Sequence, residues 1–255
     1  MKTKSRSIQQ IIEEQMQRWQ IMRTKKVGKK PGIPIITISR EPGSGGRVLA
    51  TKIAEKFGLD VFHNEVLHEI ARRADVSAKL LETLDEKGLN VLEDWISSLV
   101  YDRHLWPDEY LQHLMKVIGA IGKHGRAVII GRGANFVLPP ENRLRLRIIA
   151  PLESRIENVA RTFKVSAEDA KRRVIRTESD RRAFVRKYFN ADIADPVNYD
   201  LVINTSSLGM DNVVKAVSAL LQPYIHKFDE EMVLSQKQLS QPKAGGCSIV
   251  NRGTV

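Results

Sequence analysis

The chain of 255 residues combines 42% hydrophobic with 28% charged side chains, the proportions of a globular protein with one sizeable core. No apolar run approaches the roughly 20 residues that a membrane-spanning helix needs, and no apolar segment follows the basic N-terminus, so we expect neither a membrane partner nor a secretory signal. The single cysteine, Cys247, excludes a disulfide framework and suits a reducing compartment, so we expect a cytoplasmic protein.

The net charge of +11 attracts polyanions without selecting among them. Basic residues gather in two segments, Lys25–Lys30 and Arg172–Lys187. Neither segment has the interleaved aromatic residues of an RNA-binding module, and the six histidines show no metal-ligand spacing. We therefore expect no specific nucleic-acid partner and no zinc site. Small, highly charged phosphates account for the second basic segment at least as well.

Residues 1–32 are expected to lie outside the main domain. Apolar side chains recur at helical spacing over residues 7–23, which predicts an amphipathic helix. Such a helix packs on its own domain or on a second subunit, so oligomerisation through it is one possibility. The charged segment Lys25–Pro34, with its glycines and prolines, then predicts a linker.

The core begins with a β-branched run, Ile35–Ser39, which leads into a glycine-rich loop and then a helix. Asp60–Phe62 suits a second short strand. Residues 64–124 are helical by pattern, with interruptions near Gly88 and at Pro107.

Strands and helices continue to alternate toward the C-terminus. We predict strands at Ala127–Ile130, Leu144–Ala150 and Leu201–Asn204, and helices at Leu152–Phe163, Ser166–Phe189 and Asp211–His226. This alternation implies a largely parallel sheet that is covered on both faces. Residues 228–255 are polar and aperiodic, so we expect a disordered tail.

The segment Gly43-Ser44-Gly45-Gly46 lies between the first strand and its helix, where backbone N–H groups and the helix dipole can hold an anion. A standard phosphate-binding loop reads G-x-x-x-x-G-K-[ST]. Here Gly46 occupies the lysine position, Arg47 the Ser/Thr position and Arg40 the first glycine position. Arg47 could supply the charge one position later, but the hydroxyl that normally binds magnesium is absent.

Further segments follow the loop in a specific order. They are His63-Asn64-Glu65, Ile130-Gly131-Arg132-Gly133, Arg176–Arg181 with Phe184–Phe189, and Asp195-Pro196 followed by Tyr199–Thr205. Together with the loop Ser39–Arg47, they resemble the cytidylate kinase-like family, a branch of the P-loop nucleoside monophosphate kinases, over roughly residues 33–221. The resemblance implies a P-loop NTPase-type three-layer α/β fold with a five-stranded parallel sheet, in a domain of residues 33–227.

The resemblance also implies how the domain is divided. ATP would bind through its phosphates at residues 43–47, held by the backbone and by Arg47. Residues 64–124 would form a helical acceptor-binding region, and residues from about 164 to 190 would form a lid.

The same resemblance implies roles for individual side chains. Arg132 matches the arginine that grips the acceptor's phosphate in cytidylate kinases, and Asn64 stands where relatives often have an aspartate near the acceptor. Arg176 and Arg181 of the lid would act on the transferring phosphoryl group. Gly133 replaces an aspartate of true cytidylate kinases.

Mg²⁺ is the second cofactor that the resemblance implies, as a bridge between ATP phosphates. Glu41 and Glu65 are the carboxylates nearest the motifs, and either could hold the ion through water. No Walker-B aspartate is evident, so we assign no direct metal ligand.

Three functions remain open at this point. The first is ATP-dependent phosphoryl transfer to a nucleoside monophosphate, with CMP or dCMP as the leading acceptor. The second is a regulatory nucleotide-binding protein without turnover, favoured by the unusual residues at positions 46, 47 and 133. The third is a kinase for a small metabolite. We expect Trp95, Tyr101, Trp106 and Tyr110 to form a packing cluster rather than a base-stacking platform.

Overall fold

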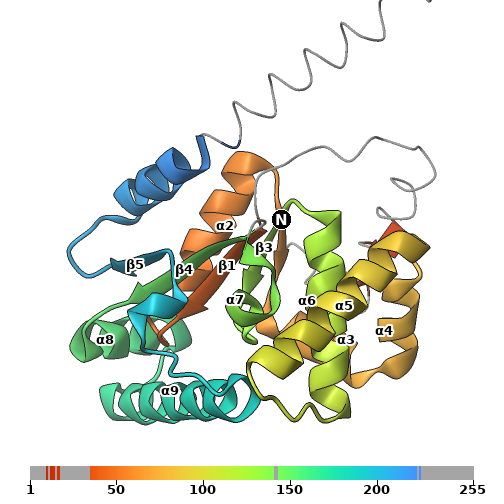
Figure 1. The fold of residues 1–255 in the computed structure, drawn as a ribbon. Helices are drawn as coiled ribbons and strands as arrows, with labels where there is room; N and C mark the ends of the chain where they lie inside the picture. The colour runs from red at the N-terminus through yellow and green to blue at the C-terminus, as the bar shows by residue number, and fades with distance from the viewer. Residues whose placement is uncertain are drawn as a thin grey trace, which may run out of the picture.

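The structure, a computed structural model, describes residues 10, 12–14, 16, 17, 35–140, 143–222 and 224 (Figure 1). The predicted linker and C-terminal tail lie outside these residues, as does much of the predicted N-terminal helix. The described residues of that segment are helical. Ile12 is buried in one of the two hydrophobic cores of the domain, the core that contains Ile35, and Met16 packs against the same core. Among the described helices, none is long and apolar enough to cross a bilayer.

Five parallel strands form one sheet, as predicted, and their order is β2-β3-β1-β4-β5. The central strand β1 pairs with β3 and β4 in a register that places Ile38 opposite both Ile130 and Leu146. Because all strands run in one direction, their carboxyl ends share the edge at which α/β proteins bind ligands. The strands are β1 (Ile35–Arg40), β2 (Asp60–Phe62), β3 (Ala127–Ile130), β4 (Arg143–Ile149) and β5 (Leu201–Asn204).

Most helix boundaries follow recognisable caps. The helix α9 begins after Ser166, whose Oγ accepts a 3.1 Å hydrogen bond from the Asp169 N–H, and α2 ends at Gly58 in the left-handed conformation. Residues 210–222 form a closing helix. The others are α2 (Gly46–Phe57), α3 (Asn64–Arg72), α4 (Ala74–Leu81), α5 (Glu86–Asp102), α6 (Glu109–His124), α7 (Ala134–Val137), α8 (Leu152–Phe163) and α9 (Ala167–Phe189).

Hydrophobic cores cover both faces of the sheet. Ile36 and Ile38 lie in a core with α2 and the closing helix, whereas Ile35 lies in a second core with α3 to α7. A continuous apolar strand whose side chains alternate between two cores is typical of a parallel sheet buried on both faces. The helices accordingly lie in two layers around the sheet, which is the predicted three-layer P-loop NTPase-type fold (Figure 1).

The interruption predicted near Gly88 is confirmed at residues 82–85, where Asp85 Oδ1 accepts a 2.8 Å hydrogen bond from the Gly88 N–H and so caps α5. The expected packing cluster of aromatic residues was wrong for two of its members. Tyr101 and Trp106 are not packed, since they are 82% and 95% exposed. The interruption at Pro107 is confirmed, between the end of α5 and the start of α6.

The last residue of α9, Phe189, fastens this helix to the core, and its loss should be costly. Phe189 is fully buried and its ring stacks on Phe136 with centroids 5.2 Å apart. We expect Phe189→Ala to lower the free energy of unfolding by about 3–5 kcal/mol, measured by denaturant titration. Phe163→Ala on α8, where the ring is 52% exposed, should cost less than about 1 kcal/mol. Equal losses for the two variants would contradict this account.

Candidate phosphate-binding site

The glycine loop joins β1 to α2 at the carboxyl edge of the sheet. Gly43 and Gly45 both have a φ of 81°, a conformation that other residues rarely adopt. A Cβ at Gly43 would also overlap the carbonyl oxygen of Arg155. Gly45 is the N-cap of α2 and provides no side-chain cap, which leaves the positive end of this helix suited to an anion. This is the geometry that the predicted ATP-phosphate site requires.

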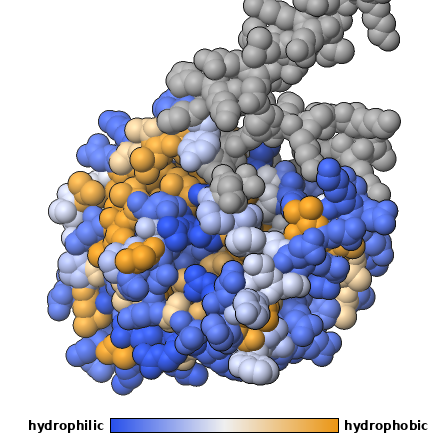
Figure 2. Space-filling view, viewed as in Figure 1, coloured by the Kyte–Doolittle hydropathy of each residue, from blue (hydrophilic) through white to orange (hydrophobic). Residues whose placement is uncertain are grey.

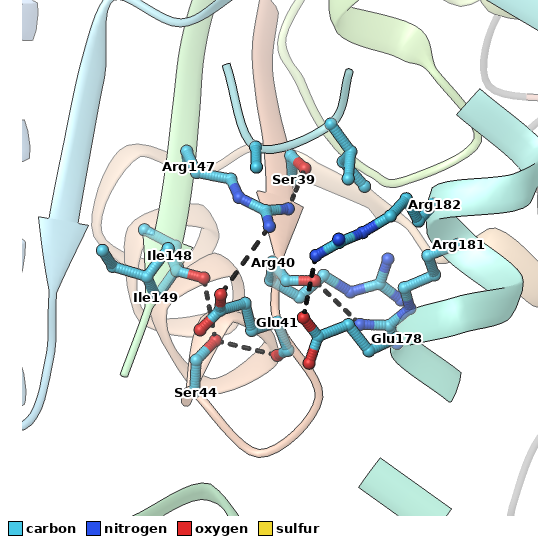
Figure 3. A network of polar contacts seen from close by, with 12 residues as sticks. Ser39, Arg40, Glu41, Ser44, Arg147, Ile148, Ile149, Glu178, Arg181 and Arg182 are labelled. Atoms are coloured by element: carbon cyan, nitrogen blue, oxygen red, sulfur yellow. Dashed lines mark hydrogen bonds and ion pairs between the residues drawn. The ribbon is translucent and has the colours of Figure 1, made fainter. Parts of the chain in front are cut away.

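Ser44 fixes the loop against its neighbours. Its side chain is buried, with Oγ 2.9 Å from the Glu41 carbonyl oxygen and 3.1 Å from that of Ile148 (Figure 3). The Ser44 carbonyl in turn accepts a 2.8 Å hydrogen bond from Thr205 Oγ1. The hydroxyl therefore points into the protein, so the contribution of Ser44 to an anion site is limited to its backbone.

Arg40, the last residue of β1, is a site residue for which sequence reasoning proposed no role. Its Nη2 donates a 2.7 Å hydrogen bond to Asn64 Oδ1 at the start of α3. Its carbonyl oxygen accepts a 2.8 Å hydrogen bond from Arg181 Nη1, so that α9 reaches the loop at this point (Figure 3). The available signal was an arginine where a standard loop begins with glycine.

Arg47 extends from the start of α2 toward α3. Its Nη2 lies 2.8 Å from Glu65 Oε1, and both side chains are more than half exposed. Partial burial of Glu65 opposes its ionisation, but a backbone hydrogen bond and Arg47 outweigh that effect and lower the pKa of the carboxyl group. Arg47 is thus held between the glycine loop and the predicted acceptor-binding region.

Arg132 lies in the turn after β3, in a strained and partly unsatisfied environment. It has a φ of 53° between Gly131 and Gly133, which have φ of 79° and 70°. Its buried Nε has no hydrogen-bond partner among the described residues, and its guanidinium carbon lies 5.2 Å from the centroid of the Phe184 ring. A buried donor without a partner is costly unless a ligand completes it, so the geometry suits an anion bound at Arg132.

Arg40, Arg47, Arg132 and Arg181 form what we call the arginine cluster. Burial is the main cause that lowers the pKa of Arg40 to about 9 and that of Arg181 to about 10. Repulsion from other arginines lowers both pKa values further, and Glu65 opposes the shift. Because guanidinium groups keep their protons at neutral pH, the cluster holds more positive than negative charge. A ligand with several anionic oxygens would relieve that repulsion.

Arg176, the other predicted lid residue, lies elsewhere. It is exposed and lines a hollow on the outer side of α9 together with Arg172, Arg173 and Asp180. The lower margin of the molecule, where α9 lies, is mostly hydrophilic (Figure 2). The structure brings Arg181 to the arginine cluster but not Arg176, because the two side chains leave the helix in different directions.

Aromatic side chains surround Arg132 on the side of the helical region. His68 Nδ1 lies 3.0 Å from the Tyr110 hydroxyl, and the Tyr110 ring centroid is 6.1 Å from that of Tyr188. Burial is the main cause that lowers the pKa of His68, and the positive charge of Arg132 is the next. The neutral form of this imidazole is therefore favoured. The sequence placed Tyr110 in a different predicted cluster and gave no role to His68. His68 lies on α3 and approaches Tyr110 because α3 packs on α6.

A buried ion-pair network ties α9 to the loop. Arg155 of α8 lies 2.7 Å from Glu178 (Nη1–Oε2) and 3.4 Å from Glu41 (Nε–Oε2). Glu41 Oε2 also accepts a 3.0 Å hydrogen bond from the Ala150 N–H. Glu41 therefore holds the loop in place, which argues against its predicted role near Mg²⁺. Arg155 is a positioning residue that sequence reasoning missed, because its partners are distant in the chain.

Comparison with known proteins shows which family the sequence matches. The cytidylate kinase-like family matches residues 35–207, a range that contains the whole arginine cluster. A cytidylate kinase of Methanopyrus kandleri is 28% identical over 205 residues, covering 76% of this chain and 96% of the relative. A cytidylate kinase of Desulfurococcus amylolyticus is 30% identical over 187 residues, covering 71% of this chain and 91% of the relative.

A solved structure has a similar fold. An uncharacterized protein from Eubacterium ventriosum superposes with a TM-score of 0.59 at 22% sequence identity, covering 75% of this chain and 99% of that protein. At this identity the likeness concerns the fold alone.

If the arginine cluster binds phosphates, inorganic tripolyphosphate should stabilise the folded protein. At a ligand concentration of about 100 times Kd, the stabilisation is about 2.7 kcal/mol, or roughly 5–10 °C in Tm for a domain of this size. In Arg181→Gln, a tenfold loss of affinity at the same concentration would halve that shift.

The matched control for this measurement is Arg172→Gln on the same helix. Arg172 pairs with Asp169 on the outer side of α9, so its tripolyphosphate shift should equal that of the unmodified protein. Equal shifts in Arg181→Gln and Arg172→Gln would contradict the site.

Proposed function

The chain belongs to the cytidylate kinase-like family, and from this membership we propose that it transfers the γ-phosphoryl group of ATP to a nucleoside monophosphate, with CMP or dCMP as the leading acceptor. The observation that carries the proposal is the arginine cluster, in which four arginines gather between the glycine loop and the helical region and Glu65 pairs with one of them, Arg47. Phosphoryl transfer requires charge neutralisation and in-line positioning rather than a protein nucleophile.

The donor binds through its phosphates at the loop. Backbone N–H groups of residues 43–47 and the N-terminus of α2 hold the phosphate oxygens of ATP. Arg47 adds a charge on the side that faces α3, where Glu65 orients it. The rigid anchoring of Ser44 keeps these donors in place before ATP arrives.

The acceptor binds on the opposite side of the arginine cluster. Arg132 binds its phosphate through the buried Nε, which has no hydrogen-bond partner in the described part of the chain. The base lies among His68, Tyr110 and Tyr188, whose rings provide apolar faces for stacking and polar atoms for hydrogen bonds. Gly133 provides no aspartate for base recognition, and a Cβ there would overlap the Phe189 ring. In this proposal the rings of His68, Tyr110 and Tyr188 recognise the base.

Residues 164–190 act as a lid in this proposal, with Arg181 reaching the transferring phosphoryl group. The Arg155–Glu178 pair holds α9 so that Arg181 contacts the loop. Closure excludes water and so prevents ATP hydrolysis. The γ-phosphorus–oxygen bond to ADP breaks as a bond to the acceptor's phosphate oxygen forms.

Mg²⁺ fits this site as a partner of the ATP phosphates rather than as a resident ion. Among the described residues, no three His, Cys, Asp or Glu side chains gather into a metal site. Glu65 is the carboxylate at the arginine cluster that could contact the hydrated ion, in keeping with the few protein ligands that Mg²⁺ uses beside phosphates. When bound, Mg²⁺ would neutralise part of the phosphate charge.

The direct test is ADP formation from Mg-ATP with CMP, dCMP, UMP, AMP, GMP or no acceptor. We expect turnover to require one pyrimidine monophosphate. Arg132→Asn, which tolerates a positive φ, should lower kcat/KM for the acceptor about 100-fold, because a charged grip on phosphate is lost.

Arg126→Asn is the matched control, since Arg126 also has a positive φ, of 54°, but lies at the amino end of β3. It should leave kcat/KM within about twofold. A folded protein that binds ATP yet forms no ADP with any acceptor would instead indicate the nucleotide-binding regulatory function or a different acceptor.

A further inference from the structure

The glycine loop departs from a standard phosphate-binding loop at three positions, and two of them, 40 and 46, exchange their residue types. The standard pattern begins with glycine and carries its lysine six residues later. In this chain Arg40 stands at the glycine position and Gly46 at the lysine position. A cationic side chain and a glycine are thus both present, but in reversed places.

The structure shows that positions 40 and 46 compete for one space. A Cβ built at Gly46 would lie 2.7 Å from Arg40 Cβ and 3.2 Å from Arg40 Cγ. A side chain longer than hydrogen at position 46 therefore meets the stem of Arg40. The two positions face each other across the loop, and only one of them can carry a long side chain.

We propose that Arg40 is a phosphate-binding catalytic residue that replaces the missing loop lysine, reaching the nucleotide from the end of β1 instead of from the start of α2. The inference rests on the proposed function, because the phosphate that Arg40 binds is that of the ATP donor. It also accounts for Gly46, whose missing side chain makes room for Arg40.

The surroundings of the Arg40 guanidinium fit this role. Its Nη2 contacts Asn64, and its Nη1 lies next to Gly131, where a Cβ would be 2.5 Å away. The head group thus lies between the glycine loop and the turn that carries Arg132. This is the position from which one guanidinium can contact both the donor and the transferring phosphoryl group in a bidentate way.

Among the described residues, no carboxylate forms an ion pair with this guanidinium. Its hydrogen-bond partner Asn64 is uncharged, and Arg181, Arg47 and Arg132 are like charges in its vicinity. A purely structural arginine would be expected to pair with a carboxylate. Glu65 is the carboxylate nearby, and its oxygen is 2.8 Å from Arg47.

The experiment compares Arg40→Gln, Arg40→Gly, and Arg40→Gly combined with Gly46→Lys. Arg40→Gln removes the charge and keeps a polar side chain, whereas Arg40→Gly removes the side chain altogether. Circular dichroism and Tm establish folding, calorimetry with ATP and with tripolyphosphate gives Kd, and ADP formation gives kcat. Arg72→Gln, an exposed arginine at the end of α3, is the control for general loss of charge.

We expect Arg40→Gln and Arg40→Gly to weaken ATP and tripolyphosphate binding at least tenfold, with Arg72→Gln within twofold of the unmodified protein. The paired exchange should recover at least tenfold in affinity over Arg40→Gly, because a lysine at position 46 then occupies the vacated space. Unchanged affinity in Arg40→Gln overturns the proposal, as does a folded exchange variant that recovers nothing.

The binding and turnover results separate the two proposals. Normal turnover in Arg40→Gln would overturn the role of Arg40 and leave the kinase function standing. A protein without turnover whose tripolyphosphate affinity still depends on Arg40 would leave Arg40 as a phosphate ligand and overturn the kinase function.

Discussion

Mutual repulsion within the arginine cluster is the constraint on which the rest of the site depends. The cluster draws its members from the end of β1, the start of α2, the turn after β3 and the middle of α9. Each element must therefore be held firmly enough to keep like charges close together, at a cost in folding free energy. The parallel sheet fixes the first three at one edge, and the Arg155–Glu178 pair fixes α9. A phosphate ligand would convert this unfavourable arrangement into a favourable one.

The loop shows how the same chemistry can be reached with different residues. The backbone of a phosphate-binding loop depends on glycine at Gly43 and Gly45, whose positive φ leaves little choice. The cation is less constrained, because any long basic side chain that reaches the same space can supply it. If Arg40 takes that place, as we propose, the absence of lysine is not a sign of lost activity. The Ser/Thr that usually holds Mg²⁺ has no such substitute among the described contacts.

Sequence reasoning predicted those features that depend on neighbours in the chain. The helix α9 and the strand β3 follow from local patterns, and both were predicted correctly. Features that depend on packing were not accessible. The sequence predicted the same role for Arg176 and Arg181. In the structure α9 packs so that only Arg181 points toward the loop.

The central claim is that donor and acceptor phosphates meet at one arginine cluster, and a bisubstrate ligand tests it most directly. The ligand is adenosine and cytidine joined through five phosphates, and calorimetry would compare its Kd with those of ATP and CMP. If the two nucleotide sites adjoin, linkage should make it bind at least 100-fold more tightly than ATP alone. An affinity no greater than that of ATP would contradict the account, because the loop would then bind a nucleotide with no acceptor site beside it.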